Sequence, residues 1–198
     1  DWRASDTVMM YASVNRGTKA GNFSAPVFLP FAVADLPHDQ EVLTAYELGV
    51  KSTVFDGRAR LNASAFHYDY DDYQAFFLAN LSQRIANRHA TIDGLELELT
   101  VNPVSGLDLS LGASYLDGEV KDITLPSGRI TDREMPMSPE WGLNGLIRYG
   151  WDAFGGTLAV QTDAVYSDTF NFYVLNPPST QEPAYVVVNA RVAFTSCD

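Results

Sequence analysis

Hydrophobic and polar residues alternate with a period of two along most of the chain. In residues 44–73, apolar side chains such as Tyr46 and Leu48 fall on one face of an extended strand, because successive strand side chains point in opposite directions. Asp56 and Gly57 then supply a pair that favours the positive backbone angles of a tight two-residue hairpin turn. This stretch is therefore predicted to form two long strands folded back on each other.

The same alternation recurs and predicts eight strands, most of about ten residues or more, whereas strands in soluble sheets average about five or six. The predicted strands cover residues 7–16, 44–55, 58–73, 90–101, 107–116, 140–149, 157–167 and 186–194. Long and short connections alternate between them, with long ones at 17–42, 76–89, 117–139 and 171–183. Turns on one side and large loops on the other are typical of antiparallel transmembrane β-barrel strands. We therefore expect an all-β fold, with a soluble sandwich or β-solenoid as the weaker alternative.

Aromatic residues fall where two membrane interfaces would lie. With the long loops outside the cell, the outer rim would hold Tyr46, Tyr115, Trp141 and Tyr166, and the inner rim Tyr149 and Phe194. All six belong to the apolar faces of their strands, as two aromatic girdles around a lipid-facing band require. The opposite faces carry polar residues of both charge signs, which suits a watery or plugged interior.

The third predicted strand, residues 58–73, leaves its facing open. Its first part has the apolar residues Leu61, Ala63 and Ala65 on one face, and its second part has Phe66, Tyr68 and Tyr70 on the other. Either a β-bulge near Ala65 restores the pattern, or these aromatic side chains point into the lumen. The sequence does not decide between the two.

Composition narrows the classes of function. The chain has 198 residues, 46% of them hydrophobic, and a formal charge of −12, so a nucleic-acid partner is not expected. Cys197 is the only cysteine, which excludes an intrachain disulfide and a cysteine-rich metal site. No apolar run reaches the roughly 18 residues of a spanning helix. The chain starts at Asp1 without a signal segment, so we interpret it as an internal fragment.

Acidic residues and histidines offer two chemical alternatives. Glu96 and Glu98 share one strand face, a spacing that could serve a glycosidase, but a polar lumen wall explains them more simply. The second group consists of one histidine and three aspartates, namely His67, Asp69, Asp71 and Asp72. It could bind a hard cation or iron, but an acidic strand end above the girdle explains it better. His38 and His89 stand alone in predicted loops. We therefore predict no catalytic, metal or cofactor residue and no enzyme activity.

Three stretches resemble the barrel of TonB-dependent outer-membrane receptors. They are YASVNRGTKAGNF from Tyr11, TAYELGVKSTVFDGRARLNASAFHYDYDDYQ from Thr44 and ATIDGLELELTVNPVSGLDLSLGASYLDGEV from Ala90. The resemblance implies a bacterial outer-membrane barrel of about 22 strands with a plug inside. It also implies TonB-energised uptake of a scarce nutrient: a ferric siderophore is expected, with cobalamin or a glycan left open. Residues 1–198 would then be part of the barrel domain, with the plug, the TonB-contacting segment and the terminal strands outside the chain. Outer-membrane lipid, the TonB complex and the nutrient are the implied partners.

Candidate ligand contacts come from the aromatic residues of the long loops, namely Phe76, Phe77, Phe172 and Tyr173, although loop packing explains them equally well. A second hypothesis is a small closed barrel of eight strands that acts as a passive pore or adhesion platform. A third is an outer-membrane hydrolase or lectin-like protein, for which we find no Ser/His pairing in register.

Overall fold

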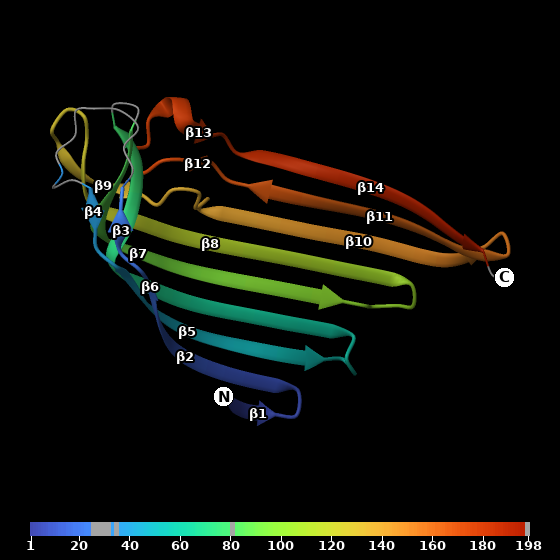
Figure 1. The fold of residues 1–198 in the computed structure, drawn as a ribbon. Coiled ribbons are helices and arrows are strands. Elements are labelled where there is room, and N and C mark those ends of the chain that lie inside the picture. Colours follow the sequence, from blue (N-terminus) through green and yellow to red (C-terminus); the bar gives the residue numbers. More distant parts are fainter. Residues whose placement is uncertain (25–32, 34–35, 80–81, 197–198) are drawn as a thin grey trace.

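The computed structural model describes residues 1–24, 33, 36–79 and 82–196, and one curved antiparallel sheet dominates it (Figure 1). Its strands, in spatial order, are β1 (Trp2–Ser5), β2 (Val8–Lys19), β5 (Glu41–Val54), β6 (Ala59–Ala79), β7 (Ser82–Val101), β8 (Leu107–Thr124), β10 (Trp141–Ala153), β11 (Gly156–Ser167) and β14 (Tyr185–Ser196). Strand β9 (Ile130–Glu134) pairs with the end of β8. The all-β, antiparallel prediction is confirmed, as are the eight long strands, to which the structure adds the short β1.

The connections have the predicted sidedness. Short turns join β5 to β6, β7 to β8 and β10 to β11 at one end of the sheet, and the longer segments gather at the other (Figure 1). Within these segments lie two small sheets, β3 (Asn22–Phe23) with β4 (Pro37–His38) and β12 (Phe170–Asn171) with β13 (Gln181–Glu182), and the 3-10 helix η2 (Pro178–Thr180). No helix in the described part of the chain is both long and apolar enough to cross a bilayer.

The prediction of a loop at residues 76–89 is wrong. Strands β6 and β7 continue as a hairpin there, paired from Tyr73 and Arg88 out to Ala79 and Ser82. Beyond the membrane neither face of a hairpin has to meet lipid, so the alternation of apolar and polar residues fades while the backbone pairing continues. The segment also contains neither Gly nor Pro, the strongest breakers of a strand.

The turn after β5 lies where it was predicted but is longer. Pairing ends at Val54 and Ala59, so four residues, not two, form the connection. Phe55, Asp56 and Gly57 all adopt positive φ angles of 54°, 55° and 86°. The N–H of Arg58 donates to the carbonyl oxygen of Phe55 at 3.1 Å and closes the turn.

Strand β6 points its aromatic side chains Phe66 and Tyr68 into the lumen, which is one of the two alternatives that the sequence left open, and the described pairing has no bulge near Ala65. The register between β5 and β6 runs without a shift, and Phe66 lies directly opposite Glu47 on β5 and Gly94 on β7. A Cβ atom added at Gly94 would overlap the Phe66 ring, so the glycine makes room for that ring. Tyr11 covers Gly49 in the same way.

The two aromatic girdles are present on the face predicted to contact lipid. Tyr115 and Trp141 pair across β8 and β10 with ring centroids 4.9 Å apart, and Tyr149 stacks on Trp151 at 5.4 Å near the other rim. Between the rims the apolar side chains point away from the sheet, as shown by Leu48, which is 64% exposed. Trp151 is a member of the inner girdle that the sequence pattern did not single out.

Two β-bulges lie at the same height above the outer girdle. The register shifts between Tyr70 and Tyr73 on β6 and between Val120 and Ile123 on β8. Each bulge contains an aspartate with positive φ, Asp72 at 57° and Asp122 at 55°. Bulges bend strands, and beyond these two the β6–β7 and β8–β9 hairpins rise steeply from the wall (Figure 1).

The raised hairpins share a small hydrophobic core, whose fully or almost fully buried members are Ala75, Ala90, Val120, Ile123, Met135 and Val174. Tyr70, Tyr73 and Phe77 pack against it from β6. Residues from β6, β7, β8, the β9 end and the β12–β13 connection thus meet in one cluster. The wall itself needs no such core, because its apolar side chains face lipid.

The sheet is open in the described part of the chain, since no pairing joins β14 to β1 or β2. Lipid cannot satisfy the backbone groups of an unpaired edge. We therefore expect residues 1–198, expressed alone in mild detergent, to aggregate or remain unfolded. Size-exclusion chromatography and a heat-dependent shift on a denaturing gel test this. A heat-resistant monomer would contradict it and favour the small closed barrel.

We expect Gly94→Val, placed in a complete barrel, to lower the free energy of unfolding by about 1–3 kcal/mol, because the new side chain would overlap the Phe66 ring. Urea unfolding followed by tryptophan fluorescence measures the change. Phe66→Ala added to the same chain should recover most of the loss. Gly17→Val on β2 is the matched control, because a Cβ atom there meets nothing within 4 Å. Equal stability of Gly94→Val and its parent would show that the ring does not need this space.

Candidate functional site

An aromatic pair lies among the connections at the loop end of the sheet. Phe76 projects from the raised part of β6, and Tyr173 follows β12 almost a hundred residues later. Their ring centroids are 6.2 Å apart, with a tilt of 32° between the planes. Phe76 keeps 38% of its surface exposed. The structure therefore brings two of the four predicted contact residues together at an accessible place.

The other two predicted contact residues lie differently. Phe77 sits on the opposite face of β6 from Phe76 and packs against the buried core of the hairpins. Phe172 is exposed and makes an edge-to-face contact with Phe170 on β12, with ring centroids 5.2 Å apart. Phe77 therefore packs within the loops, which was the alternative to a ligand contact, whereas the side chain of Phe172 is accessible to a ligand.

A polar cavity of about 630 Å³ opens between the β8–β9 hairpin and the β12–β13 connection. The Asn171 side chain at its edge is only 5% exposed, and its Nδ2 donates to Oε2 of Glu134 at 2.9 Å. The N–H of Met137 in turn donates to the carbonyl oxygen of Asn171. These bonds fix the two connections to each other. The cavity offers carboxylates, amides and the cation of Arg133 to a polar ligand.

Charges on the β8–β9 hairpin hold its shape. Lys121 bridges Glu119 and Asp132, with its Nζ 3.1 Å from Oδ2 of Asp132. The N–H of Asp122, at the bulge, donates to Asp132 and, together with Lys121, lowers the pKa of that carboxyl group below its usual value. Asp132 therefore remains ionised to lower pH than a free aspartate, and its bond to Asp122 ties the bulge to β9.

A strap of polar contacts joins the β2–β5 connection to the β6–β7 hairpin. Asp39 donates its N–H to Oδ1 of Asn87 at 2.8 Å, and its carbonyl oxygen accepts from Nε2 of Gln74 at 3.1 Å. The backbone N–H of Gln74 donates to Glu41 at 2.8 Å. Sequence reasoning missed Gln74, Asn87 and Asn171, because nothing in their spacing distinguishes them from other polar loop residues. These bonds, the Asn171–Glu134 bond and the shared hydrophobic core join the β2–β5 connection, the β6–β7 and β8–β9 hairpins and the β12–β13 connection at the loop end of the sheet. We call this joined end the mouth.

The acidic candidates from the sequence occupy two separate places. Glu98 lies on the lumen face, where its Oε2 accepts from Asn62 at 3.1 Å, and Glu96 shares that face one pair further along β7. This agrees with a polar lumen wall. A hydrogen bond between Tyr11 and Glu47 extends the same wall toward β2.

The second acidic group lies above the outer girdle. Asp69, Asp71 and His89 can bring one ligand atom each within 4.8 Å of one another, and Nε2 of His89 lies 3.6 Å from Oδ1 of Asp69. His67 pairs separately with Asp93 at 2.8 Å. The four residues suggested by the sequence therefore do not form one cation site. Asp72 serves the bulge, and His38 lies in β4 opposite Asn22.

Solved structures share this fold. The ferric yersiniabactin uptake receptor FyuA of Yersinia pestis matches 99% of the chain with a TM-score of 0.76 and 20% sequence identity. The ferric preacinetobactin receptor BauA of Acinetobacter baumannii matches 99% with a TM-score of 0.75 and 17% identity. The siderophore receptor PiuA of the same species matches 98% with a TM-score of 0.72 and 20% identity. The chain spans 29%, 28% and 28% of their respective lengths.

A sequence model of one family also matches the chain. The model describes the TonB-dependent receptor-like β-barrel, and it matches residues 1–196, almost the whole chain. Proteins with this barrel lie in the outer membrane of bacteria. On this match, the chain belongs to the TonB-dependent receptor-like β-barrel family.

Proposed function

We propose that the chain is part of the barrel of a receptor that takes up a ferric siderophore across the outer membrane with energy relayed by TonB. The family match over residues 1–196 supports the receptor class. Among the similar structures, FyuA is a ferric yersiniabactin uptake receptor, BauA a ferric preacinetobactin receptor and PiuA a siderophore receptor, which supports the ligand class. Because the chain spans less than a third of their length, the proposal assigns the plug domain, the TonB-contacting segment and the remaining strands to regions outside residues 1–198.

The observation that carries the proposal is an open wall with a linked mouth. The nine strands of the path from β1 to β14 form a gently curved sheet, which suits a wide barrel with an enclosed plug better than a narrow closed one. The lumen face offers such a plug charged and polar partners that include Glu47, Lys51 and Glu98. A passive pore of eight strands would close only if β14 paired with β1 or β2. Among the described residues, no such pairing exists.

The aromatic pair supports a ligand-binding role for the mouth. Phe76 and Tyr173 are exposed or half-exposed, lie on different connections and present ring faces on which a planar ligand group can stack. The polar cavity beside the β12–β13 connection provides hydrogen-bonding groups for the rest of a large ligand. In this proposal Phe172 is a third contact, and Phe77 supports the hairpin from its core side.

We expect uptake of a radiolabelled ferric siderophore by cells that carry the complete receptor to stop when the gene for TonB is deleted, whereas binding at the cell surface persists. Energy is needed to move the plug, and the extracellular contacts do not depend on it. Uptake and binding are measured on the same cells with a panel of siderophores. Uptake that survives the deletion would exclude this mechanism and restore the passive pore.

We expect the double variant Phe76→Ala, Tyr173→Ala to bind the ferric siderophore about tenfold more weakly, the equivalent of about 1.4 kcal/mol for lost ring contacts. Equilibrium binding to whole cells gives the Kd. The matched control is Phe154→Ala, which removes a 91% exposed aromatic residue at the turn between β10 and β11, far from the mouth. An unchanged Kd in the double variant, with normal receptor levels, would remove these residues from the site without affecting the transport proposal.

A further inference from the structure

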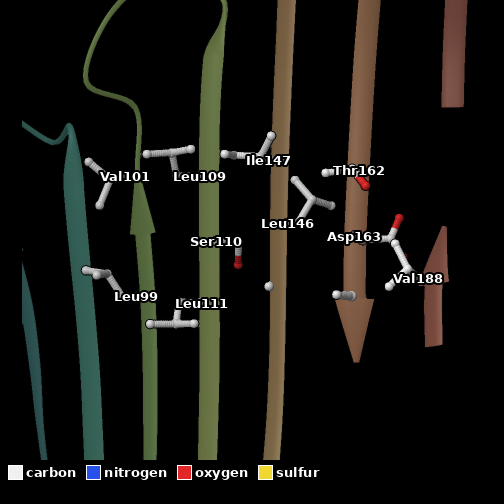
Figure 2. A pocket seen from close by; sticks show the side chains of 12 residues that line it. Leu99, Val101, Leu109, Ser110, Leu111, Leu146, Ile147, Thr162, Asp163 and Val188 are labelled. Carbon is white, nitrogen blue, oxygen red and sulfur yellow. The ribbon is translucent and has the colours of Figure 1, made fainter. Parts of the chain in front are cut away.

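A hollow of about 530 Å³ interrupts the lipid-facing band between the two girdles (Figure 2). The small residues Gly145 on β10 and Ala164 on β11 lie side by side in one cross-strand row. Leu111 on β8 and Val188 on β14 continue the row on either side, and Ile147 borders it one pair along β10. The wall is thus indented where two strands carry little or no side chain.

The glycine in this row is not required by the backbone. A Cβ atom at Gly145 would have the carbonyl oxygen of Ser110 as its nearest neighbour, at an ordinary 3.8 Å. This differs from Gly94 and Gly49, where an added Cβ atom would overlap an aromatic ring. A larger side chain would therefore fit at position 145, and the glycine leaves the space open.

The lining favours hydrocarbon over water. Its exposed surface is almost wholly apolar, and two of the polar residues at its border already have partners. The Thr162 hydroxyl donates to the carbonyl oxygen of Asn189 at 2.9 Å, and the Asp163 carboxylate accepts from Nδ2 of Asn189 at 2.9 Å. A buried water needs two to four polar partners, and these residues have their hydrogen bonds elsewhere.

The depth of the hollow points to one leaflet. The hollow spans two rows on β10: Gly145 lies four residues from both Tyr149 of the inner girdle and Trp141 of the outer one, and Ile147 lies two residues from Tyr149 and six from Trp141. At the strand rise of about 3.4 Å per residue, Gly145 is about 14 Å from each girdle, and Ile147 is about 7 Å from the inner girdle and about 20 Å from the outer one. Each leaflet contributes about 15 Å of hydrocarbon. The hollow therefore extends from the middle of the band toward the inner girdle, within reach of an acyl chain of the periplasmic leaflet.

We propose that this hollow binds one acyl chain of a phospholipid from the periplasmic leaflet. It is continuous with the surface that the bilayer already covers, and a flexible hydrocarbon chain can follow the row from Leu111 to Val188. An acyl chain in the hollow makes close van der Waals contacts with the side chains that border it. Lipid that lay flat against the wall would not reach these side chains. The site goes beyond nutrient uptake, because no residue of the mouth takes part in it.

The test uses the complete receptor in liposomes that contain phosphatidylethanolamine with a photoreactive diazirine in one acyl chain. After illumination, mass spectrometry locates the labelled peptides. We expect labelling concentrated on β8, β10 and β14 around Leu111, Ile147 and Val188. Gly145→Leu or Ala164→Leu should reduce it several-fold by filling the hollow. Ala113→Leu, on the same face of β8 but outside the hollow, is the matched control and should leave it unchanged.

Two outcomes would overturn the proposal. Labelling spread uniformly along the lipid-facing band, or labelling that Gly145→Leu does not alter, would mean that the hollow binds no acyl chain. A receptor dimer that cross-links through β10 and is lost in Gly145→Leu would mean that a second copy occupies the hollow. Siderophore binding by each variant confirms that the barrel has folded, since the substitutions lie far from the mouth.

Discussion

The wall depends on backbone hydrogen bonds that only neighbouring strands can provide. Lipid offers no partner for an N–H or a carbonyl group, so each strand must stay in register with both of its neighbours across the membrane. This constraint decides the facing of β6, whose side chains would otherwise fit better reversed near Ala65. The register with β5 and β7 holds, Phe66 points into the lumen, and Gly94 accommodates its ring.

The sequence was sufficient to predict the wall because lipid on one side and a polar lumen on the other impose a period of two. Tyr115 and Trp141 illustrate this, since their rim position and their shared face both follow from the alternation. Residues 76–89 escaped prediction because the alternation disappears above the membrane while pairing continues. The facing of residues 58–73 stayed open for a related reason: local apolar order allowed either a bulge near Ala65 or inward-pointing aromatic side chains, and only pairing with the neighbouring strands decides for the second and locates a bulge between Tyr70 and Tyr73.

The candidate site was likewise predictable from the sequence only in part. Residue type and loop position were enough to suggest Phe76 and Tyr173, but not that their rings lie 6.2 Å apart, because that depends on how two connections fold over the wall. Polar ties such as the bond from Asn171 to Glu134 leave no periodic signal in sequence. They nevertheless help to fix the mouth, since they join segments that also meet in the hydrophobic core through Met135 and Val174.

The two bulges at Asp72 and Asp122 have a consequence for dynamics. They lie at one height, and above them the raised hairpins possess their own core, separate from the wall. Native proteins open locally in contiguous cooperative units that often coincide with supersecondary motifs such as hairpins. The shared core therefore makes the two hairpins one candidate cooperative unit for amide hydrogen exchange, distinct from the paired strands below them.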